Sequence, residues 1–323
     1  MAKGFWGKLK RPILALAPMA DVTDSAFRRL IAKYGKPDVM WTEFVSCDGL
    51  CSSKGQTVLL RNLKYSVTER PIVAQIFGSK PENFYQCAKL LKKLKFDGID
   101  INMGCPDRKV EKQGGGAKLM LNPVLAKEII RQTKRGAGGL PVSVKTRIGY
   151  NKKDLEGWVG SLIEAEPDVL IIHARTRKEM SKVPADWKAV KEVVKLVKKS
   201  GKDILVIGNG DVKDLEDAKK KIKQSGADGA MVGRGIFGNP WFFNKRKKKI
   251  SLVEKLKVLV EHARLFEKVS GKKNFAVMRK HFKAYIVGFD GAVGLRAKLM
   301  RANNSKEVVA TLRAKYPKIG FQR

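Results

Sequence analysis

A cysteine between a glycine and a proline follows a strand-like run in the first third of the chain. The run Gly98–Ile101 predicts a strand, and Cys105 follows it within the turn Gly104-Cys105-Pro106. A thiol on a loop just past the end of a strand is held where a ligand can reach it. Most free cysteines, however, fill small apolar spaces in protein cores. This stretch alone leaves a catalytic role and a packing role for Cys105 equally open.

Polar side chains occupy the ends of most other strand-like runs, and packing alone explains them poorly. A lysine at a buried strand end costs free energy unless an anion lies beside it. Lys145 therefore predicts an anionic ring or a phosphate nearby. The first run ends in the backbone of Pro18-Met19-Ala20. The remaining strand-end residues are Gln75, Asn102, Lys145, Arg147, His173, Arg175, Arg177, Asn209, Asp211 and Arg234.

Two glycine-containing turns follow the last two strand-like runs. They are Asn209-Gly210-Asp211 and Gly233-Arg234-Gly235. Backbone N–H groups at these positions of a barrel commonly bind phosphate, and Arg234 adds a fork of donors. Plain turn chemistry is the alternative, because glycines are common in such loops. A phosphate here, with Lys145, Gln75 and the Pro18–Ala20 backbone around a ring, would describe a site for flavin mononucleotide (FMN).

Eight strand-like runs alternate with amphipathic helical stretches. This pattern favours an α/β fold, a (β/α)8 TIM barrel, over a doubly wound sheet. No Gly-x-Gly-x-x-Gly motif follows a strand, which argues against a Rossmann dinucleotide site. Barrel enzymes place their chemistry at the carboxyl ends of the strands, so the strand-end residues should meet in one mouth. The expected strands are 13–17, 39–42, 72–75, 98–102, 142–145, 169–173, 205–208 and 229–232, and the helices between them include 24–34, 81–94, 122–135, 188–199 and 214–224.

The pattern changes after the eighth run. From Leu252 onward only helical periodicity is present. We therefore expect an FMN-binding catalytic barrel at residues 1–243 and a small all-α domain at residues 244–323.

The charge of the chain is far from balanced: 67 Lys and Arg stand against 31 Asp and Glu, for a formal net charge of +36. Such a surplus repels itself unless a polyanion is nearby, so a nucleic acid or an anionic membrane is the expected partner. The number does not separate RNA, DNA and lipid. It also disfavours self-association, and we expect a monomer.

The four cysteines form no C-x-x-C pair and the three histidines are scattered, so we expect neither a zinc site nor a disulfide framework. This fits the cytoplasm. The apolar stretch 12–20 follows basic residues, as in an export signal, but it leads directly into a capped helix and is interpreted as the first strand. No apolar run reaches the ~18–20 residues of a membrane span. We expect no membrane among the partners of the protein.

Six strings occur in an order that resembles the tRNA-dihydrouridine synthase family. They are APMADVTDSAFRRL, DGIDINMGCP with QGGGAKLM, VSVKTRIG, IIHARTR, VIGNGDV and GADGAMVGRGIFGNPWFF, and they cover Ala17–Phe243. The segment RKHFKAYIVGFDGAVGLR resembles the helical domain of that family more loosely.

The resemblance implies an FMN enzyme that reduces specific uridines in tRNA to 5,6-dihydrouridine with NADPH. Hydride passes from reduced FMN to C6 of the uracil, and Cys105 donates the proton to C5. A thiol with a pKa near ~8.5 is mostly protonated at neutral pH, which suits an acid. Lys145 would stabilise the reduced ring, and His173 aligns with a position near the flavin; a packing role for that histidine is the alternative.

The same match places Asn102 and Arg147 against the target uracil, with Arg175 and Arg177 as further substrate contacts. Ser181 and Val183 depart from the tyrosine and glycine that the family commonly carries after this arginine motif. Lys and Arg on the helical segment would hold the tRNA phosphates while the uridine is extruded. Two other functions stay open: a flavin oxidoreductase acting on a small pyrimidine, which the charge disfavours, and a non-catalytic RNA-binding protein.

Overall fold

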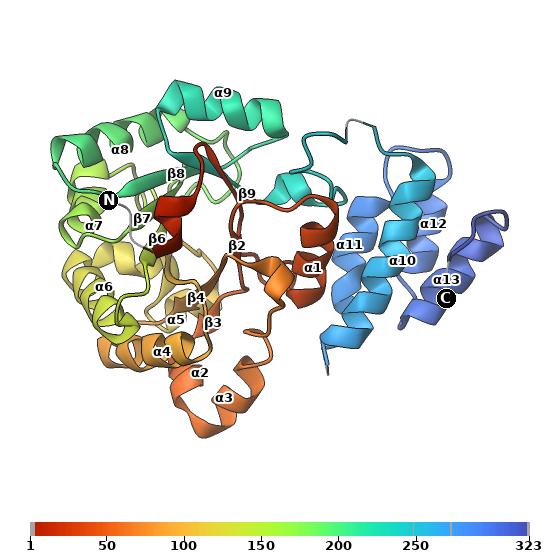
Figure 1. Ribbon diagram of the computed structural model, residues 1–323, viewed down its shortest axis with the longest axis horizontal. Helices are drawn as coiled ribbons and strands as arrows, with labels where there is room; N and C mark the ends of the chain where they lie inside the picture. The colour runs from red at the N-terminus through yellow and green to blue at the C-terminus, as the bar shows by residue number, and fades with distance from the viewer. Residues whose placement is uncertain (1–3, 248, 272, 322–323) are drawn as a thin grey trace.

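Parallel strands form a barrel with helices around it, and a lobe of helices lies at one side (Figure 1). The computed structural model describes residues 4–247, 249–271 and 273–321. The strands are β1 (Ile13–Leu16), β2 (Met40–Trp41), β3 (Val45–Ser46), β4 (Ile72–Phe77), β5 (Gly98–Met103), β6 (Val142–Arg147), β7 (Val169–His173), β8 (Leu205–Asn209) and β9 (Gly229–Val232).

The strand order confirms the TIM-barrel prediction. The hydrogen-bonded path runs β1-β9-β8-β7-β6-β5-β4-β2, and a parallel bridge between Ala15 and Val39 joins its two ends. The second strand differs from the prediction, because it is split: β2 and β3 both pair with β4, with Met40 opposite Ile72 and Val45 opposite Ile76. Eight positions around the barrel are therefore filled by nine strand segments.

Helices of the barrel begin where side chains cap them. The Asp24 carboxylate accepts a hydrogen bond from the Phe27 N–H, and Asn122 accepts one from Leu125 in the same way, so each satisfies an N–H at its helix start. The barrel helices are α1 (Ser25–Tyr34), α2 (Cys47–Cys51), α3 (Ser53–Leu59), α4 (Pro81–Lys93), α5 (Arg108–Lys112), α6 (Pro123–Ala137), α7 (Gly160–Glu164), α8 (Trp187–Lys199) and α9 (Leu215–Ser225).

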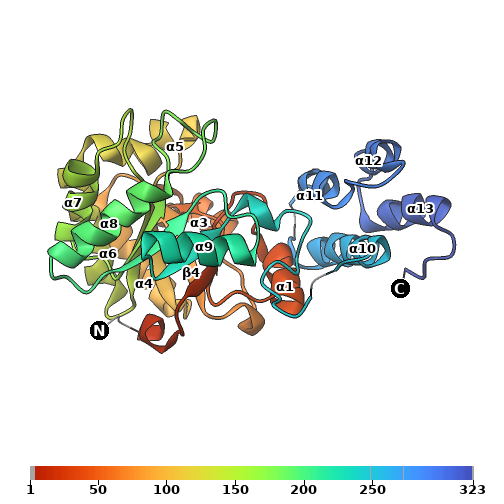
Figure 2. The same ribbon diagram turned by 90° about the horizontal axis from the view of Figure 1, so that it is seen from above.

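The helical lobe has an apolar core of its own, which also reaches into the barrel. Its helices are α10 (Leu252–Val269), α11 (Met278–Tyr285), α12 (Ala292–Leu299) and α13 (Ser305–Lys315). Ala26 and Leu30 of α1 pack into this core together with Trp241. Figure 2 shows α1 lying between the barrel and α10. None of the helices in the described residues is long and apolar enough to cross a membrane.

Two histidines lie at the junction between barrel and lobe. His262 and His281 are fully buried, their ring centroids are 4.4 Å apart, and Phe27 of α1 packs against both rings. None of their four ring nitrogens has a hydrogen-bond partner within the described residues. Burial lowers the pKa of His281 to about 3 and holds that of His262 well below its usual value. Both rings are therefore neutral in the folded protein.

This pair predicts acid sensitivity of the folded protein. The unfolded histidines bind protons near pH 6.5 and the folded ones do not, so stability is complete above that pH and falls as the pH drops toward 3. At pH 5 the buried, neutral His281 should cost about 2 kcal/mol, and His262 should add to this loss. Replacing His281 with Phe should shrink the difference in unfolding free energy between pH 7.5 and pH 5. Denaturant titrations at both pH values measure it, and an unchanged difference would contradict the assignment.

Candidate active site at the mouth of the barrel

A pocket of about 640 Å³ opens at the carboxyl ends of the strands. Its walls come from the turns after β1, β8 and β9 and from the last residues of β6 and β7. Ten residues predicted from sequence line it: Pro18, Met19, Lys145, His173, Arg175, Asn209, Gly210, Asp211, Gly233 and Arg234.

Lys145 is partly buried, and its ammonium group has a neutral partner. Its Nζ donates to Oδ1 of Asn209 at 3.1 Å, while Nδ2 of Asn209 donates to the carbonyl of Met231 at 2.8 Å. Burial lowers the pKa of Lys145 to about 8, and the positive charge of Arg147 adds to this effect. A cation in such surroundings is ready to receive an anionic group.

An arginine and aspartate network forms the side of the pocket. Arg175 is 3% exposed; it forms an ion pair with Asp211, and its Nε donates to the carbonyl of Val183 at 2.6 Å. Arg234 approaches the same Asp211 at 3.1 Å. These arginine contacts lower the pKa of Asp211. Burial and the charge of Lys145 lower the pKa of His173 well below its usual value, so its ring is neutral.

Cys105 sits on the turn after β5, half-buried. The side-chain oxygen of Asn102 accepts hydrogen bonds from the N–H groups of Gly104 at 3.1 Å and Cys105 at 2.9 Å. The Cys105 carbonyl accepts from Ala117 at 2.9 Å, which draws the glycine loop against the turn. Gly116 has a φ of +61°, and a Cβ there would lie 2.6 Å from the Cys105 carbonyl oxygen, so this approach requires glycine. Burial raises the pKa of the Cys105 thiol, which keeps it protonated at neutral pH.

Arg147 and Arg177 bind other parts of the protein. Arg147 is buried; its Nε donates to the carbonyl of Gly104 at 2.8 Å and its Nη1 to those of Thr176 and Met180. Arg177 forms an ion pair with Glu111 of α5. Arg147 thus ties the Cys105 turn to the loop after β7, and Arg177 ties the same loop to α5.

The structure separates the predicted residues into two groups. Ala20, Gln75, Asn102, Cys105, Arg147 and Arg177 are absent from the lining of the 640 Å³ pocket. The charges of Lys145 and Arg147 nevertheless act on the Cys105 thiol, so the two groups are neighbours. Sequence reasoning missed Asp100 and Ser143, which lie below the mouth inside the barrel. The signal for Asp100 was available, since a carboxylate two residues before Asn102 in a buried strand points to the same side.

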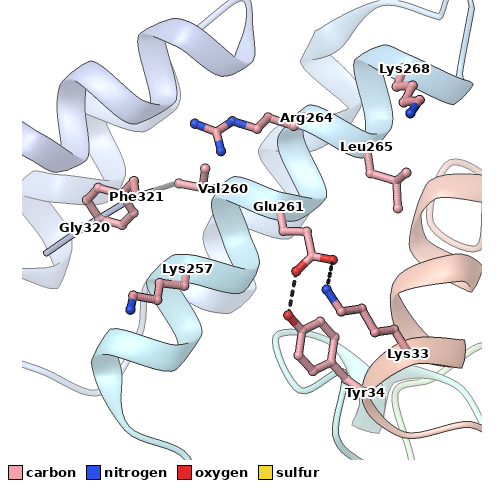
Figure 3. A pocket seen from close by; sticks show the side chains of 10 residues that line it. All are labelled: Lys33, Tyr34, Lys257, Val260, Glu261, Arg264, Leu265, Lys268, Gly320 and Phe321. Atoms are coloured by element: carbon pink, nitrogen blue, oxygen red, sulfur yellow. Dashed lines mark hydrogen bonds and ion pairs between the residues drawn. The ribbon is translucent and has the colours of Figure 1, made fainter. Parts of the chain in front are cut away.

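A larger pocket, of about 760 Å³, lies away from this mouth, between α1, α10 and the C-terminal segment (Figure 3). Lys257, Arg264 and Lys268 follow one another along α10, and Glu261 between them accepts from Lys33 at 2.7 Å and from Tyr34 at 2.5 Å. It is a basic groove beside the junction of barrel and lobe. Within residues 4–247, 249–271 and 273–321, no three His, Cys, Asp or Glu side chains are grouped so that they could hold a metal ion.

Comparison with known proteins assigns this architecture to a family. The model described as dihydrouridine synthase (Dus) matches residues 15–319. The chain belongs to the dihydrouridine synthase family. A probable tRNA-dihydrouridine synthase of Staphylococcus aureus (strain MRSA252) is 42% identical over 315 residues, which cover 97% of this chain and 95% of that protein. Probable tRNA-dihydrouridine synthase 2 of Bacillus subtilis (strain 168) is also 42% identical, over 97% of this chain and 96% of that protein.

Membership of the dihydrouridine synthase family confirms the resemblance carried by the six motifs, and makes the protein an oxidoreductase. Solved structures add the fold. Histamine dehydrogenase from Rhizobium sp. 4-9 superposes with a TM-score of 0.54 at 13% identity, covering 78% of this chain and 48% of that one. A mutant of morphinone reductase in complex with tetrahydroNAD superposes with a TM-score of 0.51 at 12% identity, covering 74% of this chain and 87% of that one. At such low identity the likeness concerns the fold alone.

Proposed function

We propose that this member of the dihydrouridine synthase family reduces uridine in tRNA to 5,6-dihydrouridine, with FMN as bound cofactor and NADPH as reductant. The observation that carries the proposal is that the Cys105 turn after β5 and the partly buried Lys145 of the adjacent strand β6 lie at the same barrel mouth, with Asn102 opposite Lys145 in the strand register. The relatives that cover nearly the whole chain are named for tRNA and dihydrouridine. The net charge of +36 suits a polyanionic substrate.

The residues of the mouth fit FMN. A pocket of about 640 Å³ is of the size that cofactors occupy. Lys145, held by a neutral amide, offers its charge to the ring. The Arg234 side chain is 63% exposed and touches Asp211 only at 3.1 Å, so its guanidinium can turn to a phosphate in the turns after β8 and β9. Gln75 is buried and does not line this pocket, and its amide is engaged by Asp100 and Asn102, so a contact with the ring would depend on its one remaining N–H.

Different side chains of the protein have different roles in the proposed reaction. FMN, when bound, supplies the hydride that it receives from NADPH. Cys105 holds the proton for C5 of the uracil, and its raised pKa keeps that proton in place until the base arrives. Lys145 places a positive charge where negative charge develops. Arg147 and Asn102 hold the backbone of the Cys105 turn, and their remaining N–H groups are available to the uracil carbonyls.

The lobe continues the basic surface from the mouth. Lys280 of α11 forms an ion pair with Asp21, directly after the Met19-Ala20 turn, and Lys273 forms one with Glu43 at 2.7 Å. The Lys280 contact holds α11 beside the turn after β1, on the mouth side of the barrel. Arg279 and Lys283 on the same helix are exposed, so they can bind tRNA phosphates while the uridine enters the mouth.

Reversing the charge of Arg279 and Lys283 to Glu should therefore raise the KM for tRNA several-fold and leave kcat nearly unchanged. Each lost phosphate contact should also reduce the dependence of log affinity on log salt by about 1. Kinetics at salt concentrations between about 50 and 200 mM measure both effects. Lys195→Glu combined with Lys199→Glu, on the exposed side of α8, is the matched control. A KM equal to that of the control would show that α11 does not bind tRNA.

The proposed cofactor and substrate can be tested together. Protein purified with its cofactor should release FMN on denaturation. The reduced protein should be reoxidised rapidly, without oxygen, by unmodified tRNA and far more slowly by free uridine. Reoxidation by free pyrimidines alone would indicate a small-molecule oxidoreductase. Binding of tRNA with neither flavin nor product would indicate a non-catalytic RNA-binding protein.

A further inference from the structure

A carboxylate that does not line the 640 Å³ pocket lies inside the barrel beneath the mouth. Asp100 is in the middle of β5 and fully buried. The strand register sets it beside Gln75 of β4 and Ser143 of β6. It accepts a hydrogen bond from Nε2 of Gln75 at 2.6 Å and one from the Ser143 hydroxyl. Burying a carboxylate costs free energy even with such partners, so its place beneath the active site calls for a function.

The hydrogen bonds continue from Asp100 to the cysteine turn in one direction. Oε1 of Gln75 accepts from Nδ2 of Asn102 at 3.1 Å. Oδ1 of Asn102 then accepts from the N–H groups of Gly104 and Cys105, at 3.1 and 2.9 Å. This series of hydrogen bonds therefore links Asp100, in the centre of the barrel, to the backbone of Cys105.

The carboxylate determines which way both amide side chains point. An ionised carboxylate only accepts hydrogen bonds, so Gln75 must turn its NH₂ group toward Asp100 and its oxygen toward Asn102. Asn102 must then donate to Gln75, which leaves its oxygen for the two backbone N–H groups. If either amide were reversed, donors would face donors. Burial raises the pKa of Asp100 to about 6, so it is ionised at the pH of an assay near 7.5.

We propose that Asp100 is a positioning residue for the reaction: acting through Gln75 and Asn102, it fixes the Gly104–Cys105 turn and thereby the direction of the thiol. The proposal rests on the proposed role of Cys105 as proton donor. Asp100 itself touches neither substrate nor cofactor. Its loss should lower kcat rather than weaken the binding of tRNA.

Replacing Asp100 with Ala should reduce kcat about 10- to 100-fold, the effect of a small misplacement of a reacting group, with the KM for tRNA unchanged. Asp100→Asn should recover most of this loss. Its Oδ1 can accept from Gln75, while its Nδ2 donates to the Ser143 hydroxyl, which can turn toward the Ile99 carbonyl at 3.4 Å. Asp168→Ala is the matched control, because Asp168 is also a buried carboxylate, bonded to the Val142 N–H at 2.8 Å at the opposite end of the barrel.

Hydrogen exchange of the Gly104 and Cys105 amides tests the proposal without using activity. In Asp100→Ala both amides should exchange about fivefold faster or more, whereas Asp100→Asn and Asp168→Ala should leave them protected. If Asp100→Ala fails to fold, Gln75→Met breaks the next link and keeps the buried charge with Ser143; it should deprotect the same two amides. Unchanged exchange in a folded Asp100→Ala or Gln75→Met protein would overturn the proposal.

A double-mutant cycle separates action through Asn102 from general destabilisation. The losses in kcat of Asp100→Ala and Asn102→Ala should be strongly non-additive, because both substitutions interrupt the same series of hydrogen bonds. Additive losses would show that Asp100 acts by another route and would overturn the proposal. If Cys105→Ala turns out to be fully active, the proposed role of Cys105 fails, while the exchange experiment still decides whether Asp100 holds the turn.

Discussion

Replacing Cys105 with Ala is expected to lower the rate of dihydrouridine formation by about 10²- to 10⁴-fold, the usual contribution of a positioned general acid. The thiol is half-buried, and burial raises its pKa, so it carries a proton at neutral pH but is no nucleophile. Cys105→Ser should recover little, because a hydroxyl is a much weaker acid. Single-turnover rates with reduced enzyme and unmodified tRNA measure the chemical step directly.

Two controls make this result specific to the thiol. Cys51→Ala removes an exposed cysteine of α2 and should be fully active. Flavin content should be equal in wild-type, Cys105→Ala and Cys51→Ala protein, since Cys105 does not line the 640 Å³ pocket. A rate for Cys105→Ala within about threefold of wild type would show that another group donates the proton.

Replacing Lys145 with Met should lower kcat by about 10²- to 10³-fold, which is the typical cost of removing one donor aimed at developing charge. Methionine keeps most of the side-chain volume, so the barrel should stay intact. Lys188→Met, at an exposed position of α8, is the control for the substitution itself. Lys145→Arg should recover part of the loss, since the charge is kept but its position changes.

The pH dependence of FMN binding tests independently whether the charge of Lys145 contributes to FMN affinity. Burial lowers its pKa to about 8 in the cofactor-free protein. Only the charged ammonium attracts an anionic group, so the affinity of apoprotein for FMN should fall as the pH rises through about 8. Fluorescence titrations between about pH 6.5 and pH 9.5 would follow this decline, and Lys145→Met should abolish it. An affinity of wild type that stays constant over this range would contradict the assignment.

The order of strands and helices could be predicted from sequence because each barrel strand is a short apolar run followed by an amphipathic helix. The split of the second strand into β2 and β3 could not, since Thr42, Glu43 and Phe44 are set by tertiary contacts. Thr42, for example, donates its side-chain hydrogen bond to the Glu43 carbonyl and accepts one from the Gln75 N–H.

The sequence predicted which side chains stand at the strand ends, but not the contacts that they make. Strand ends identified Lys145, His173 and Asn209, and these do line one pocket. The spacing of residues in the sequence does not determine which groups their side chains contact. In the structure Arg175 forms an ion pair with Asp211, and Arg147 donates to backbone carbonyls. The role proposed for Asp100 depends on the direction in which each amide points, and this direction follows from the folded arrangement of Asp100, Gln75 and Asn102.

The most direct test is to measure dihydrouridine by mass spectrometry in unmodified tRNA incubated with the FMN-loaded protein and NADPH. With the wild-type protein, uridines at defined tRNA positions should gain two hydrogens, and the yield should fall sharply with Cys105→Ala. A wild-type protein that holds FMN, oxidises NADPH and binds tRNA, yet forms no dihydrouridine, would contradict the proposed function.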